Sequence, residues 1–443
     1  MITKIQNTQS TFKGNIPQLS KKVKFLDKFL QSQENLSHTR FIQGTLTNWF
    51  PKAVLSRSFI DFSEFTFLEF IESGIFYFAA PLLGEHIYKN GIFKKVQPEK
   101  LKNTIAENLP KSLDEIGKSK LDKALKNKLT AVKAGVLLAC LVVPAMEYAL
   151  GFAKNLFTLK VFKVSNFNNV ANLNKEKKED KEHQKKVEKH SKQVLLKTGI
   201  LSLLGLIAGL GLSVFGHKTK NTLIFAKTLL EPGEQISKLL HKSGINSNKT
   251  DKFLKEYLKL DFDNNNGKLA LSKGQLALTC ITGLFGYSNA AKDRGKLDFY
   301  EVWTRVPLVV LYTIFGSALL DGKFKKYLAH KNKFPELIKT NSLGEITEVP
   351  KRRELDAIAR KLAKINNTKY EEELSKLIKQ KSVITGVPYL FSLLAMGFTL
   401  SGISRLWTQY RYNHQQKTKL QIYNNEYSKE FVKFSAAFSG IHK

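Results

Sequence analysis

One short pattern of ionisable residues occurs twice in the sequence, in the form R-x-x-I/L-D-F-x-E, and the second copy follows the first by 237 residues (294 − 57 = 237). The copies consist of Arg57, Asp61 and Glu64, and of Arg294, Asp298 and Glu301. Residues spaced i, i+4 and i+7 share one face of a helix, so each copy can present a guanidinium beside two carboxylates. Two such faces can line a shared site between related helical units.

The same spacing also fits a structural role. Asp61 with Glu64, and Asp298 with Glu301, have the N-cap to N3 spacing of a capping arrangement, in which carboxylates satisfy the free N–H groups at a helix N-terminus. Each arginine would then pair with the carboxylates of its own copy. Both interpretations predict a helix start near each motif, and they differ in whether the copies meet.

Four further charges interrupt stretches that are otherwise apolar: Glu69, Glu72, Glu147 and Arg305. A charge within a membrane is costly unless it is paired, protonated or hydrated. Since each copy of the repeat carries a charge that the other lacks, we hypothesise a salt bridge from Arg305 to Glu69 or Glu72. Glu147 is a candidate for an ion or proton pathway, and the alternative is that it lies at the membrane interface.

Six apolar runs must position these charges, and two of them contain no charge at all. The run between Lys197 and His217 has 19 residues, about 28 Å of helix, and the run between Lys381 and Arg405 has 23, about 34 Å. Both lengths suit a bilayer core. The less regular runs are Phe65–Gly84, Ala134–Ala153, Gln275–Ala291 and Val306–Leu320. Gly205 and Gly209 have the G-x-x-x-G spacing that allows two membrane helices to pack closely.

The charge of the chain lies between these runs. Lys and Arg number 71 against 38 Asp and Glu, a net charge of +33, while 42% of the residues are hydrophobic. That hydrophobic content excludes a wholly disordered chain. Only nine of the basic residues are arginine, which disfavours a nucleic-acid reader. The sequence therefore predicts an all-α, multipass helical membrane protein with Lys-rich extramembrane connections.

Two of the Lys-rich connections contain amphipathic patterns. Their apolar residues recur at three- and four-residue spacing: Leu101, Ile105, Leu109, Leu113 and Ile116, and then Leu355, Ile358, Leu362 and Ile365. One interpretation is docking on anionic lipid headgroups, and the other is packing against another helix of the protein.

The repeat suggests a division of the chain. A weaker match places Gly135, Val136, Gly151 and Lys154 against Gly386, Val387, Gly402 and Arg405. Taken together, the matches predict two related two-helix membrane units, residues 55–155 and 292–410. A polar basic tail (1–54), a charged linker with central apolar helices (156–291) and a basic C-terminal tail (411–443) complete the predicted organisation.

Known chemical motifs are missing from the sequence. Cys140 and Cys280 lie in apolar runs, and no spacing of Cys, His or carboxylates predicts a metal ligand set. Asp261 begins a calcium-loop pattern, but Asn266 and Ser272 stand where Gly and Glu belong. No cofactor, catalytic residue or cleavable signal peptide is expected.

These observations favour a non-enzymatic integral membrane scaffold or organiser that binds anionic lipid or an acidic partner, with homo-oligomerisation possible. A channel or transporter that uses Glu69, Glu72, Glu147 and Arg305 is the first alternative. A lipid-modifying membrane enzyme is the second, for which the repeated motif supplies the sequence's candidate polar cluster.

Overall fold

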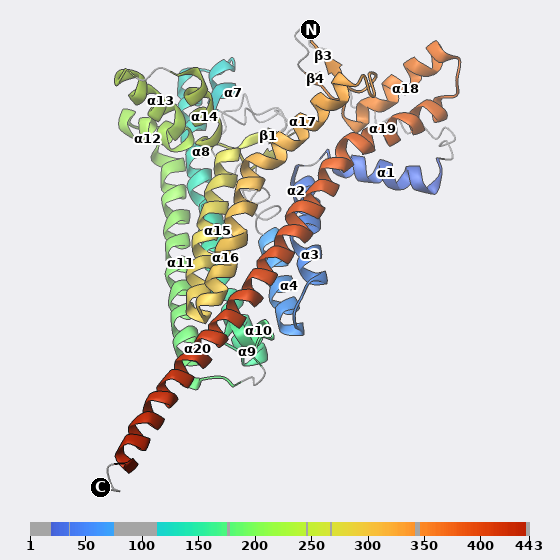
Figure 1. Cartoon of the computed structure of the whole chain (residues 1–443). Helices are drawn as coiled ribbons and strands as arrows, with labels where there is room; N and C mark the ends of the chain where they lie inside the picture. Colours follow the sequence, from blue (N-terminus) through green and yellow to red (C-terminus); the bar gives the residue numbers. More distant parts are fainter. Residues whose placement is uncertain are drawn as a thin grey trace. The chain divides into compact units, whose positions relative to one another are not determined.

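The computed structural model describes residues 19–34, 36–74, 113–174, 178–244, 247–265, 268–341 and 346–439, which are almost entirely helical (Figure 1). The all-α prediction is confirmed at this level. Two short antiparallel hairpins interrupt the helices in the described residues. Strand β1 (Asp263–Asn265) pairs with β2 (Lys268–Ala270), and β3 (Lys339–Thr340) pairs with β4 (Ile346–Glu348).

The helices follow one another with short connections. Those before residue 216 are α1 (Lys21–Ser32), α2 (Leu36–Gly44), α3 (Phe50–Val54), α4 (Phe59–Ser73), α7 (Leu113–Lys118), α8 (Lys123–Cys140), α9 (Val142–Phe162), α10 (Phe167–Val170) and α11 (Lys181–Phe215). Those after it are α12 (Lys220–Leu230), α13 (Pro232–Lys242), α14 (Asn248–Tyr257), α15 (Lys273–Arg294), α16 (Lys296–Leu311), α17 (Ser317–His330), α18 (Arg352–Asn366), α19 (Tyr370–Phe391) and α20 (Leu400–Ser439). Three π-helical segments are η1 (Thr45–Trp49), η6 (Tyr312–Gly316) and η7 (Ser392–Thr399).

Four helical stretches of the described residues are long and apolar enough to cross a membrane: Lys123–Phe162, Lys181–Phe215, Lys296–His330 and Tyr370–Glu430. The short run Val306–Leu320 lies within one of them because flanking residues extend its helix. The run Gln275–Ala291 forms α15 but is not among them. It is instead an internal helix, where a Cβ on Gly286 would lie 2.2 Å from the carbonyl oxygen of Tyr148 in α9.

Polar caps fix where the long helices begin. Asp122 accepts the N–H of Leu125 at 2.8 Å at the start of α8. Ser272 and Gln275 form a reciprocal capping box at the start of α15. Pro144 lies in the first turn of α9, where a missing N–H costs little, so α8 and α9 form one stretch of 40 residues.

The described chain forms two compact units. The first combines residues 1–35 with 320–388, and the second combines 36–319 with 389–443. This division differs from the predicted boundaries, because the N-terminal segment and the segment after residue 320 share a core that no pattern along the chain reveals. The predicted C-terminal tail continues α20 as helix to Ser439.

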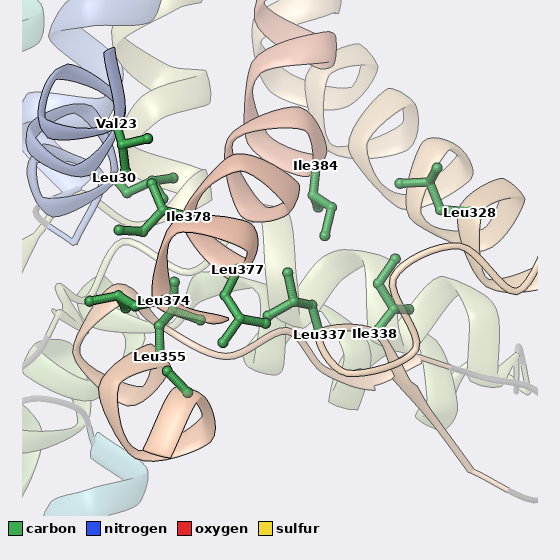
Figure 2. Close-up of a cluster of buried hydrophobic side chains, with 11 residues drawn as sticks. Val23, Leu30, Leu328, Leu337, Ile338, Leu355, Leu374, Leu377, Ile378 and Ile384 are labelled. Atoms are coloured by element: carbon green, nitrogen blue, oxygen red, sulfur yellow. The ribbon is translucent and has the colours of Figure 1, made fainter. Parts of the chain in front are cut away.

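The core of the first unit consists of apolar side chains from α1, α18 and α19 and the segment between α17 and β3 (Figure 2). Leu355 and Ala359 of α18 are fully buried in it, and Ile358 and Leu362 pack against it. Only Ile365 of the predicted amphipathic face is exposed, at 71%. The face therefore packs against the protein, as the second interpretation expected, and is not available to dock on lipid.

The first amphipathic pattern is described only in part. Leu101, Ile105 and Leu109 lie outside the described residues. Ile116 is buried in a cluster with Leu125 and Leu129 of α8, and Leu113 packs against the same cluster. This part of the pattern also faces protein.

The second unit is a helical bundle in which α11 packs along α8 and α9, and α15 packs along α9 and α16 (Figure 1). Its outer surface is apolar. On α11, the side chains of Ile200, Leu201, Leu204, Ile207 and Leu210 are all more than half exposed. A soluble protein rarely exposes a continuous apolar stripe of this length.

Close packing of α11 on α8 depends on glycine. A Cβ on Gly209 would lie 2.5 Å from the carbonyl oxygen of Gly135 and 3.0 Å from the N atom of Ala139. Gly205 is less tightly packed, 3.4 Å from the carbonyl oxygen of Leu138 by the same measure. Gly211 faces open space. The backbones of the two helices thus meet at Gly209.

We predict that Gly209→Ala lowers stability by about 1–3 kcal/mol, because the added methyl group has to displace backbone. Gly211→Ala, on the same helix, should leave stability unchanged or raise it by up to about 1 kcal/mol through its better helix propensity. Thermal unfolding of the detergent-purified chain measures both changes. Equal melting temperatures for the two variants would contradict the proposed packing.

Candidate functional site

The two copies of the repeated motif begin two helices at equivalent positions. Helix α4 starts at Phe59 and α16 at Lys296, the same offset of 237 residues (296 − 59 = 237). Ser58 is the N-cap of α4 and accepts the N–H of Asp61 at 3.0 Å. Gly295 precedes α16 with a φ of 130°, a conformation that favours glycine. The capping interpretation is therefore wrong in its register, since the aspartates lie in the first turn.

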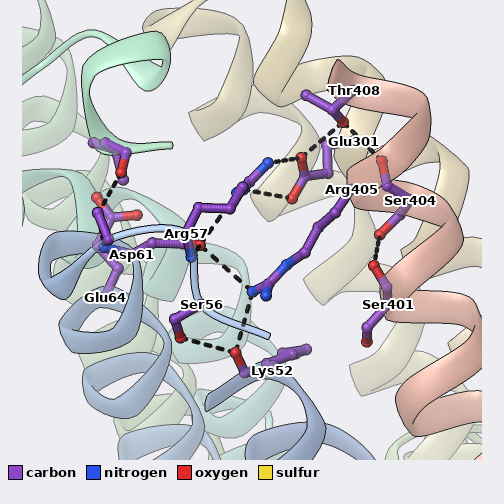
Figure 3. Close-up of polar contacts among 12 residues, drawn as sticks. Lys52, Ser56, Arg57, Asp61, Glu64, Glu301, Ser401, Ser404, Arg405 and Thr408 are labelled. Atoms are coloured by element: carbon purple, nitrogen blue, oxygen red, sulfur yellow. Dashed lines mark hydrogen bonds and ion pairs between the residues drawn. The ribbon is translucent and has the colours of Figure 1, made fainter. Parts of the chain in front are cut away.

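The arginines join the two copies reciprocally. Arg57 donates to Glu301 of the other copy through both terminal nitrogens, at 2.8 and 3.0 Å. Arg294 donates to Glu64 of the other copy, at 2.8 Å to one carboxylate oxygen and 3.0 Å to the second. Each guanidinium also pairs with the aspartate of its own copy: Arg57 Nε lies 3.3 Å from Asp61, and Arg294 Nε lies 3.2 Å from Asp298. The polar faces predicted from the spacing meet, and Figure 3 shows the half that contains Arg57.

Further groups from helices α9, α10 and α20 complete this cluster. Thr158 of α9 donates to Glu64, and Thr408 of α20 donates to Glu301 at 2.8 Å (Figure 3). The ring of Phe167 in α10 lies between the two arginines, with its centroid 5.3 Å from Cζ of Arg57 and 5.7 Å from Cζ of Arg294. Each copy thus receives one threonine hydroxyl, and both share one aromatic ring.

The weaker sequence match is only partly reflected in the contacts. Lys154 lies 3.9 Å from Glu64, and Arg405 lies 3.5 Å from Asp61 and donates to the carbonyl oxygen of Lys52 at 3.2 Å. Both cations therefore contact carboxylates of the first copy. Their roles are not exchanged between copies as those of the motif arginines are.

A cavity of about 110 Å³ lies beside this cluster, within the second unit. Ten ionisable aspartate, glutamate, lysine and arginine side chains line it. The carboxylates are Asp61, Glu64, Glu69, Glu72, Asp298 and Glu301, and the cations are Lys52, Arg57, Lys154 and Arg305. Three of the four charges predicted within apolar runs are among them. The fourth, Glu147, lies behind the wall of the cavity and is only 4% exposed.

The hypothesised salt bridge of Arg305 is not formed. Glu69 pairs instead with Lys52 of α3, and both side chains are buried. Within the described residues, Nη1 of Arg305 is buried without a hydrogen-bond partner, and its guanidinium lies 5.3 Å from the ring centroid of Phe65. The sequence alignment could not reveal Lys52, because it precedes the repeated motif.

Glu72 and Glu147 meet at a tyrosine. The hydroxyl of Tyr287 in α15 lies 3.0 Å from Oε2 of Glu72 and 2.8 Å from Oε1 of Glu147. The sequence analysis missed Tyr287, which is the one hydroxyl-bearing aromatic of an otherwise apolar run and follows Gly283 by one helical turn. That spacing was the available signal, because a small residue one turn away leaves room for a neighbouring side chain.

Comparison with known proteins identifies no relative: no family, curated protein or solved structure matches the chain. In the part of the chain that the structure describes, no group of three or more His, Cys, Asp or Glu side chains could hold a metal ion. What the site offers chemically is a small, charged chamber with six carboxylates and four cations in its wall.

We predict strong coupling between Arg57 and Glu301. Arg57→Ala or Glu301→Ala alone should lower stability by about 3–5 kcal/mol, because each leaves a buried charge without its partner. The double variant should lose less than the sum of the two. A double-mutant cycle on the purified chain, followed by thermal or denaturant unfolding, measures this coupling.

The exposed pair Lys118–Asp114 is the matched control. Its atoms are 2.6 Å apart, but the side chains are 78% and 68% exposed, so the coupling should not exceed about 1 kcal/mol. Additive losses at Arg57 and Glu301 would mean that the pairing does not hold the copies together.

Proposed function

We propose that this chain is an integral membrane protein that moves protons or other small cations through the charged chamber. The observation that carries the proposal is the chamber itself, a cavity lined by ten ionisable side chains inside a bundle whose outer helices are apolar. A soluble protein has the reverse arrangement, with charges outside and apolar side chains inside. Within a membrane, clustered ionisable groups that face the bundle interior mark ion and proton pathways.

The charge of the chamber supports a positive occupant. Six carboxylates against four cations leave two negative charges in excess (4 − 6 = −2) when all groups are ionised. Isolated charges are strongly disfavoured in a medium of low dielectric constant, so the excess favours uptake of protons or cations.

A second cavity supports a route to the chamber. It has a volume of about 230 Å³ and shares Asn48 and Val309 with the chamber wall. Its other lining residues include Thr47 of η1, and Tyr312 and Thr313 of η6. π-Helical segments occur frequently at functional sites, because the wider turn leaves backbone groups free of the regular ladder.

The predicted scaffold function has lost its main support. It depended on amphipathic faces that are free to dock on anionic lipid, whereas the described parts of those faces pack against protein. The charged chamber is the feature of the second unit that packing alone does not require. A transport function therefore accounts for more of the structure than a scaffold does.

The first test is membrane integration. We expect the expressed full chain to stay in the membrane fraction through washes with high salt and alkaline carbonate and to be released only by detergent. Release by salt would mean that the positive charge alone attaches the chain to membranes, and it would overturn the proposal.

The second test is ion flux. The purified full chain in liposomes should carry a proton or K⁺ flux above that of empty liposomes, followed with entrapped dyes. Val309→Trp should reduce this flux at least about tenfold, since the indole would fill the position that the two cavities share. Leu308→Trp, on the same helix but 49% exposed and outside both cavity walls, should have no effect. Equal flux in both variants and in empty liposomes would refute a transport function.

A further inference from the structure

Three side chains from three helices form a hydrogen-bonded row at one side of the chamber. Glu72 is on α4, Tyr287 on α15 and Glu147 on α9, and the tyrosine hydroxyl lies within hydrogen-bonding distance of both carboxyl groups. We propose that this row, Glu72–Tyr287–Glu147, is a proton-binding site in which the two carboxyl groups hold one proton between them. The proposal deepens the proposed function, on which its role in transport rests.

The number of hydrogens in the row requires this proton. A phenol has one hydrogen to donate, and an ionised carboxylate has none. Two ionised carboxylates could not both form a hydrogen bond with one tyrosine hydroxyl. The distances of 3.0 and 2.8 Å are both hydrogen-bonding distances, so one of the two carboxyl groups donates its own hydrogen to the tyrosine oxygen.

The surroundings of the row disfavour two negative charges. Glu147 is 4% exposed, and its second oxygen, Oε2, is buried without a hydrogen-bond partner among the described residues. Gly283 of α15 lies against it, where a Cβ would be 2.9 Å from Oε1. Two like charges in such an environment are strongly destabilised, and a shared proton removes one of them.

The neighbouring charges do not replace the proton. On the chamber side, α4 contributes Glu69 and α3 contributes Lys52, which pair with each other, while Arg305 of α16 lies in the chamber wall. The charges that α8 and α11 carry near α9 also have partners: Lys133 pairs with Asp261, Glu188 with Lys160, and His190 with Asp293. Lys160 is 13 residues along α9 from Glu147, about 20 Å.

The order of the row gives the proton a direction of movement. Glu72 and Tyr287 line the chamber, whereas Glu147 lies behind them. When Glu72 carries the proton, it donates that proton to the tyrosine oxygen while the tyrosine hydrogen passes to Glu147. The products are an ionised Glu72 and a protonated Glu147, with the tyrosine restored. No other reactant is needed, and the reverse transfer returns the proton to the chamber.

Infrared spectroscopy of the detergent-purified full chain tests the site without requiring transport. At neutral pH we expect a carbonyl stretching band of a protonated carboxylic acid, which shifts in deuterated water. Glu147→Gln and Glu72→Gln should each remove this band, because the remaining carboxylate can accept the tyrosine hydrogen and needs no proton. Glu182→Gln, whose side chain is 76% exposed, should leave the band unchanged.

Tyr287→Phe gives a second, nearly isosteric test. It should retain a protonated acid but shift the band, since the hydrogen bond to the hydroxyl is lost, and it should reduce proton flux in liposomes at least about tenfold. Absence of the band from the wild-type protein, or its persistence in both Gln variants, would overturn the shared proton. Unchanged proton flux in Tyr287→Phe would overturn the relay.

The two proposals fail in different ways. A band that behaves as expected in a protein without flux would support the proton site and refute the transport function. Flux that is blocked by Val309→Trp in a protein without the band would do the opposite, leaving a cation pathway that does not bind a proton at this row.

Discussion

Two buried guanidinium groups, each held between an aspartate of its own motif and a glutamate of the other, are the interaction on which the second unit depends. Arg57 and Arg294 are 237 residues apart (294 − 57 = 237), yet each completes the other's cluster. A buried charge is tolerable only when it is paired and hydrogen-bonded. The helices that carry these groups must therefore keep one arrangement, because a shift of either helix would leave charges unpaired at both sites.

That constraint also defines where the chamber lies. The reciprocal pairs satisfy Glu64, Asp298 and Glu301, with help from Thr158 and Thr408, so these carboxylates are committed to holding the bundle together. Beyond them along α4, Glu69 takes Lys52 as its partner, and Glu72 has only the hydroxyl of Tyr287. The site thus passes from fully paired charges to a carboxyl pair with one hydrogen donor too few. Structural and proposed functional roles are divided along one helix.

The apolar surface and the charged interior are consistent with each other. Helix α11 exposes a continuous apolar stripe, and it can approach α8 closely because Gly209 and Gly135 bring the backbones together. Helix α15 has the opposite character, since it is enclosed by its neighbours and carries Tyr287 inward. Small residues on both helices allow close packing around polar side chains that need protein partners. The same reasoning explains why the amphipathic faces of α7 and α18 are covered by protein.

The sequence by itself determined the helical class, the apolar runs, the repeated motif and the positions of the unusual charges Glu69, Glu72, Glu147 and Arg305. These properties are local, since helix periodicity, run length and capping groups are set by residues within a few turns of one another. Only the tertiary structure decided which charges pair. Glu301 accepts from an arginine 244 residues away, Glu69 takes Lys52 in place of Arg305, and Tyr287 joins Glu72 to Glu147. An ion pair depends on the distance between side chains of different helices, and no spacing along one helix contains that distance.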